Sequence, residues 1–96
     1  MDTFSLGQVV FTRNLWTNLL SHYGDNAGIL RATADLLERH RTGDWGNLDA
    51  EDTAANDAAV KHGGRLFSSY KVGEEVVWII TEGDRSLTTL LLPEDY

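Results

Sequence analysis

The sequence contains no cysteine, a single proline and no long apolar run. Without cysteine the chain can form neither disulfides nor thiolate metal sites, so a small domain must be held together by packing. The longest apolar run, Val76 to Ile80, falls far short of the roughly 20 residues that cross a bilayer. An acid at position 2 also speaks against an export signal. These absences predict a cytoplasmic protein that does not enter a membrane.

Basic residues are scarce as well. Fifteen acids against eight bases give a formal charge of −7. A phosphate backbone would repel such a chain, so we expect no direct binding to nucleic acid, whereas a protein with a basic surface would be attracted. The chain has 96 residues, of which 42% are hydrophobic, and this predicts one globular domain spanning residues 1–96.

The hydrophobic pattern predicts an α+β domain with elements in the order βαααβββ. Period-two alternation and β-branched runs give strands at residues 6–12, 65–72, 75–81 and 86–92. Apolar spacing and capping residues give helices at residues 15–23, 26–42 and 50–62. We expect an antiparallel sheet of about four strands packed against three helices, with the first strand paired to the C-terminal ones. Only alanines form the apolar face of the third helix, which predicts close packing there.

No motif for catalysis or for a cofactor is present. The chain lacks a G-x-S-x-G nucleophile elbow, a phosphate-binding loop with its lysine, and an HExxH zinc pair. His22, His40 and His62 fall near the ends of the three predicted helices, where we expect them to interact with the C-terminal carbonyl groups. The sequence therefore predicts a protein that is not an enzyme and has no catalytic, cofactor-binding or metal-binding residues.

The most distinctive feature is an acidic segment, residues 44–57, which contains no base. Acids at the start of a helix stabilise it by about 0.3–1 kcal/mol each, which is one explanation of the pattern. The other is an anionic edge that imitates phosphates and fits a lysine-rich groove. Trp45 is either a core residue joining two helices or an exposed interface anchor. The candidate partner-binding residues are Asp44, Trp45, Asp49, Glu51, Asp52 and Asp57.

Two stretches carry a resemblance to a known group of proteins. Residues 39–48 (RHRTGDWGNL) and 78–96 (WIITEGDRSLTTLLLPEDY) resemble a family of small bacterial proteins carried on plasmids and phages. With Glu51, Asp52, Asn56 and the N-terminal strand, the resemblance covers most of the chain outside residues 13–35. Such mobile elements are also where anti-CRISPR proteins occur, so the resemblance implies an anti-defence role. It names no catalytic residues.

Two functions remain open from the sequence. The first is a non-catalytic inhibitor of anti-CRISPR type, whose acidic segment covers the basic nucleic-acid-binding surface of a CRISPR effector or related nuclease. The second is an accessory module of mobile elements that binds a ligand, or a second copy of itself, through an exposed sheet face marked by Trp78 and Tyr70. The oligomeric state, monomer or dimer, is also open.

Overall fold

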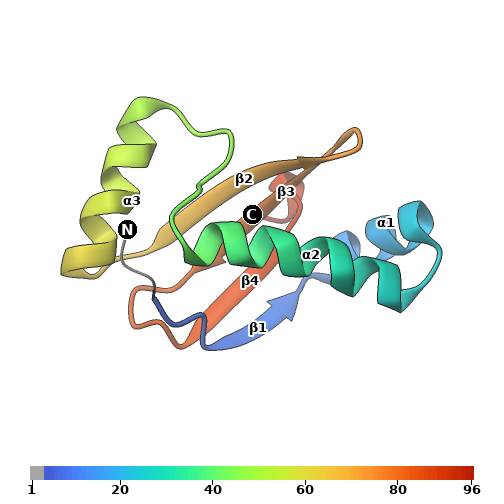
Figure 1. Ribbon diagram of the computed structural model, residues 1–96. Coiled ribbons are helices and arrows are strands. Elements are labelled where there is room, and N and C mark those ends of the chain that lie inside the picture. Colours follow the sequence, from blue (N-terminus) through green and yellow to red (C-terminus); the bar gives the residue numbers. More distant parts are fainter. Residues whose placement is uncertain (1–3) are drawn as a thin grey trace.

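The computed structural model describes residues 4–96 and has the predicted order of elements (Figure 1). The strands are β1 (Gln8–Phe11), β2 (Leu66–Val72), β3 (Glu75–Thr81) and β4 (Leu87–Leu91). The helices are α1 (Arg13–Tyr23), α2 (Asn26–Arg41), α3 (Ala50–His62) and the short 3-10 helix η1 (Pro93–Asp95). No helix in this part of the chain is long and apolar enough to span a bilayer.

The four strands form one sheet in the order β1-β4-β3-β2. Strands β2, β3 and β4 form an antiparallel meander, but β1 runs parallel to β4, so the sheet is mixed and the prediction of an antiparallel sheet was wrong in this respect. A parallel pair requires a long crossover, and the three helices between β1 and β2 provide it. The expected pairing of the first strand with the C-terminal strands is confirmed.

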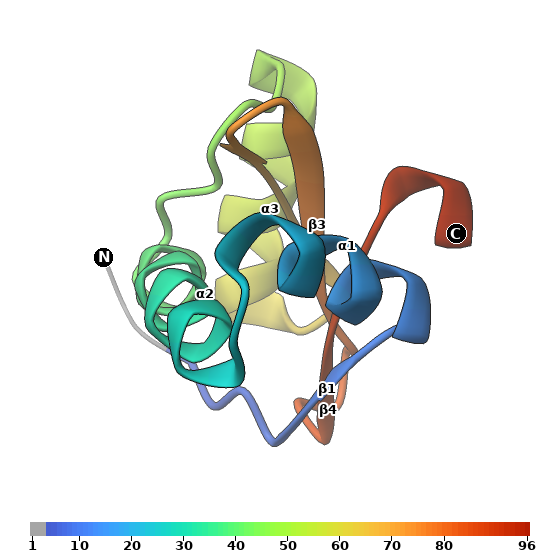
Figure 2. The same ribbon diagram turned by 90° about the vertical axis from the view of Figure 1, so that its right-hand side faces the viewer.

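Helix α2 lies across one face of the sheet, and α1 packs against α2 at the end of the strands (Figures 1 and 2). Each begins at a capping side chain: Thr12 accepts from the amide of Leu15, and Asp25 from that of Gly28. Their apolar stripes pack on alternate residues of the strands, as the period of two requires. The buried core consists of Leu15, Leu19, Ile29, Leu36, Tyr70, Val77, Ile79, Leu90 and Leu92.

Helix α3 lies beyond the edge strand β2, with its first turn at the outer end of the molecule (Figure 1). Asn56 is its only buried residue, and Ala54, Ala55 and Ala58 are exposed, so the prediction of a closely packed alanine face was wrong. The Asn56 side chain instead donates to the carbonyl of Phe67 at 2.6 Å and accepts from its amide at 3.1 Å. The side-chain amide of Asn56 thus pairs with the backbone of Phe67 at the edge of β2, as a neighbouring strand would.

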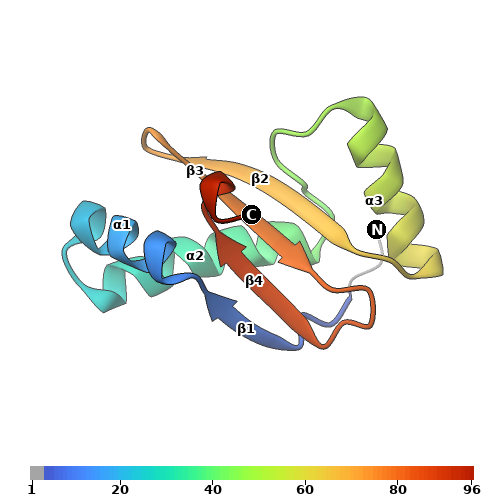
Figure 3. The same ribbon diagram turned by 180° about the vertical axis from the view of Figure 1, so that it is seen from behind.

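None of the helices α1, α2 and α3 covers the opposite face of the sheet (Figure 3). The chain turns back over this face at η1, and Figure 2 shows that the C-terminal residues lie on the side away from α2. Asp95 fixes the turn, because its carboxylate accepts from Thr12 at 2.6 Å and from Asn14 at 2.8 Å. These bonds lower the pKa of Asp95, with the Thr12 bond contributing most.

Candidate functional site

The residues of the acidic segment do not share one environment. Asp44 forms an ion pair with Arg39, with 2.7 Å between the carboxylate and Nε, and this hydrogen bond lowers the pKa of Asp44. Arg39 in turn lies over the ring of Tyr70, 4.6 Å from its centroid. Because a cation of the same chain neutralises Asp44, this carboxylate contributes little to an anionic surface.

Trp45 is buried, with 4% of its surface exposed, so the core alternative holds for this residue. Its ring contacts the ring of His40 on α2 at a centroid distance of 5.6 Å. Its indole nitrogen donates to Asp57 on α3 at 3.0 Å. Trp45 thus joins the two helices and occupies Asp57 in a contact within the chain. Neither residue offers a partner the exposed group that the acidic-edge hypothesis requires.

The three remaining acids form the first turn of α3 and are exposed. Asp49 is the N-cap, and its carboxylate accepts from the amide of Asp52 at 2.8 Å. Glu51 and Asp52 point to solvent, and no ion pair involves any of the three acids within residues 4–96. We call Asp49, Glu51 and Asp52 the acidic end. The acidic end agrees with both explanations of the acidic segment, because Asp49 caps the helix and all three acids expose negative charge.

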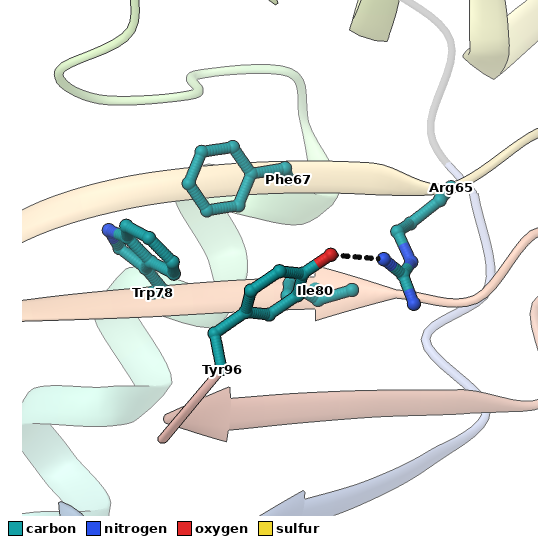
Figure 4. Close-up of a pocket in the computed structure, with 5 residues that line it drawn as sticks. All are labelled: Arg65, Phe67, Trp78, Ile80 and Tyr96. Atoms are coloured by element: carbon teal, nitrogen blue, oxygen red, sulfur yellow. Dashed lines mark hydrogen bonds between the residues drawn. The ribbon is translucent and has the colours of Figure 1, made fainter. Parts of the chain in front are cut away.

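A second candidate site lies on the open face of the sheet (Figure 4). It is a recess of about 240 Å³ that we call the aromatic recess, and it is lined by Arg65, Phe67, Trp78, Ile80 and Tyr96. Trp78 therefore marks this face, as expected. Tyr70 does not: it is 1% exposed on the covered face, and its hydroxyl donates to the carbonyl of Asp44 at 2.6 Å. Burial raises the pKa of Tyr70 to about 12.

His40 is completely buried and does not have the expected role at the end of α2. Its Nε2 lies 2.9 Å from the hydroxyl of Thr81, and its Nδ1 forms a short hydrogen bond with Ser68. Burial, and secondarily the positive charge of Arg85, lowers the pKa of His40 to about 4. This side chain is therefore a neutral imidazole at neutral pH.

The hydrogen-bond chain around His40 fixes its tautomer. Thr88 must donate to the carbonyl of Leu6 at 2.6 Å, because a carbonyl only accepts. Thr88 therefore accepts from Thr81 at 2.7 Å, and Thr81 accepts from Nε2–H of His40. Nδ1 is left to accept from Ser68. The Ser68–His40 pair resembles a nucleophile and base, but both residues are 0% exposed, so a substrate cannot reach the serine.

The structure adds no metal centre: residues 4–96 contain no cluster of three or more histidine, aspartate or glutamate side chains suited to an ion. No family model, curated protein or solved structure matches the chain. The site residues that sequence reasoning missed are polar. Asn56 and Thr81 are among the residues that carry the resemblance, but neither they nor Ser68 show a pattern that predicts their hydrogen-bond partners. His40 falls in the apolar stripe of α2, and this position could have predicted its burial.

Proposed function

We propose that this protein is a small non-catalytic inhibitor that binds, through its acidic end, the basic nucleic-acid-binding surface of a CRISPR effector or related defence nuclease. The observation that carries the proposal is the exposure of Asp49, Glu51 and Asp52 at the outer tip of α3. The resemblance of residues 39–48 and 78–96 to proteins of plasmids and phages supports the anti-defence context. The site is narrower than the acidic segment, since Asp44, Trp45 and Asp57 make contacts within the chain.

Electrostatics favours this class of partner. The three carboxylates lie at the N-terminal end of α3, and the bases of this helix, Lys61 and His62, lie in its last turn, so the negative charge of the helix is concentrated at the acidic end. A groove that holds nucleic acid is lined by lysine and arginine, and complementary charge accelerates association with it. Because the Debye length is about 8 Å at physiological ionic strength, this attraction should weaken when salt is added.

The test reverses charge without removing the cap. The double variant E51K/D52K leaves Asp49 in place as the acceptor of the first-turn amide. The matched control E74K/E94K makes the same change in net charge at two exposed acids outside α3. Affinity capture from cells that carry several defence systems identifies the effector, and nuclease assays with the purified effector then measure inhibition.

We expect E51K/D52K to lose binding and inhibition at least tenfold while its circular dichroism is unchanged, and E74K/E94K to remain close to wild type. Each substitution replaces an attraction between opposite charges by a repulsion. At a partly desolvated interface this change costs about 1 kcal/mol or more of binding free energy. Equal losses in the two variants would show that only net charge matters, and undiminished inhibition by E51K/D52K would exclude the acidic end as the binding surface.

A further inference from the structure

The aromatic recess is an enclosure of rings with one charged group at its rim. Phe67 on β2 and Trp78 on β3 meet edge to face, with ring centroids 4.9 Å apart, and Tyr96 meets Trp78 at 5.9 Å. Ile80, 5% exposed, forms the floor. Figure 4 shows Tyr96 in front of Ile80, with Arg65 at the far side from Trp78. Apart from Arg65, the lining thus offers an aromatic and apolar surface to a flat group.

The wall formed by Tyr96 is held in place from outside the recess. Asp95, the residue before it, is bonded to Thr12 and Asn14 at the start of α1. The Tyr96 hydroxyl accepts a hydrogen bond from Arg65 at 2.8 Å. Two independent anchors therefore keep the ring standing over the sheet, although 73% of the residue is exposed. A ring held in this way forms a preorganised wall.

Among the residues that the structure describes, Arg65 is the only charged one that lines the recess. Its side chain is 50% exposed, and its partner Glu82 lies 3.6 Å away, beyond hydrogen-bond distance for a well-formed ion pair. By contrast, Arg39 meets Asp44 at 2.7 Å. A guanidinium group has five donors, and Arg65 uses few of them, so it can bind an anion bidentately.

We propose that the aromatic recess binds a small molecule consisting of a planar aromatic ring system with an anionic group, a carboxylate or a phosphate. The ring packs on the apolar lining formed by Ile80, Phe67 and Tyr96, and the anion binds Arg65. The volume of about 240 Å³ is below the usual range of drug-sized pockets and suits one or two fused rings. This site is independent of the acidic end and of the function proposed for it.

Each part of the ligand follows from one part of the site. Flat rings stack against aromatic walls more favourably than saturated rings do. Among residues 4–96, the side chains that line the recess supply one cation and no carboxylate, and this favours an anion, although Glu82 lies 3.6 Å from Arg65 and the net charge of the whole chain is −7. A cationic ligand would meet Arg65 and is excluded. A neutral ring would use the walls alone and bind more weakly.

The experiment titrates the purified protein with 2-naphthoate and follows backbone amide shifts by NMR. The neutral amide of this acid, 2-naphthamide, tests whether binding needs a negative charge. Cyclohexanecarboxylate tests whether it needs a planar ring, and adenosine monophosphate tests a phosphate in place of the carboxylate. Thirteen heavy atoms at about 0.3 kcal/mol each predict a dissociation constant on the order of 1 mM. We expect the shifts to centre on Phe67, Trp78 and Ile80.

Three variants at two exposed residues, Arg65 and Tyr96, separate the parts of the site, and the amide spectrum shows directly whether the fold persists. Arg65→Gln should weaken the anionic probes about fivefold to tenfold and leave 2-naphthamide unchanged, whereas Arg65→Lys keeps the preference for an anion. Tyr96→Ala should weaken both naphthyl probes. The proposal is overturned by equal affinity for the acid and the amide, by shifts centred elsewhere, or by no shift with any aromatic anion at 10-fold the expected constant.

Discussion

Mild acid is expected to destabilise the protein through His40. The folded state holds this imidazole with a pKa of about 4, because it is buried beside Arg85, whereas in the unfolded chain its pKa is about 6.5. Between pH 6.5 and pH 4, His40 is protonated in the unfolded chain and neutral in the folded protein. Stability from this group is therefore complete above pH 6.5, falls as the pH drops, and stops falling near pH 4.

The size of the effect follows from the two pKa values. A difference of about 2.5 pH units corresponds to a total loss of roughly 3 kcal/mol, of which about 2 kcal/mol is lost by pH 5. A domain of this length has a free energy of unfolding of roughly 5–14 kcal/mol, so the loss is easily measured. Four carboxyl groups with shifted pKa values, Glu38, Asp44, Asp84 and Asp95, are all shifted downward, so they respond at lower pH.

Urea unfolding followed by circular dichroism at pH 7.5, 6.5, 5.5 and 5.0 measures the effect. The double variant H22Q/H62Q is the matched control, because it removes the two exposed histidines and should keep the wild-type pH dependence. The variant His40→Gln should lose this pH dependence of stability. A direct NMR titration gives the pKa of His40 and, from the nitrogen shifts, its Nε2–H tautomer. A midpoint near 6.5, or stability that is constant from pH 7.5 to 5.0, would refute the reasoning.

Two further predictions concern the attachment of α3 and its loop. Asn56→Ala removes both bonds to Phe67 and should cost about 1–3 kcal/mol, with faster hydrogen exchange in residues 50–62 but not in β3; exchange that quickens evenly over the whole chain would contradict a local role. Gly46→Ala should lower the melting temperature more than Gly24→Ala does. Both glycines have positive φ, but a methyl group at Gly46 would lie 2.1 Å from the Ser69 carbonyl oxygen, whereas one at Gly24 would meet nothing within 4 Å. Similar melting temperatures for the two variants would exclude this clash.

The sequence predicted the elements well because each carries a strong local signal. The helical stripe and the caps at Thr12 and Asp25 set the first two helices, and Gly73 set the β2–β3 turn. The direction of β1 relative to β4 could not be predicted, because alternation marks the two faces of a strand and not its polarity. Between these strands the chain crosses three helices, and only their packing decides the direction.

The position of Tyr70 could have been obtained from the sequence by a further step. A two-residue turn at residues 73–74 pairs Val72 with Glu75, and the same register pairs Tyr70 with Val77 and Ser69 with Trp78. Residues directly opposite each other share a face, so Tyr70 and Trp78 must lie on opposite faces. The polar partners of His40 had no such signal, because Ser68 on β2 and Thr81 on β3 meet it only when α2 lies across the sheet, and Thr88 on β4 extends the chain of hydrogen bonds from Thr81.

Helix α3 is held differently from the rest of the molecule, and this bears on both proposed sites. It buries almost no apolar surface, and its anchors are the Asn56 amide, the Trp45–Asp57 bond and Arg85, which donates to the carbonyl of Ala59 at 2.8 Å. All three anchors lie on the side of α3 that faces the rest of the chain and lie outside its first turn. The acidic end can therefore change its charge without disturbing the core. Arg85 also donates to the carbonyl of Gly64 at 2.6 Å, next to Arg65, so the segment that supplies the cation of the aromatic recess is fixed by the same guanidinium.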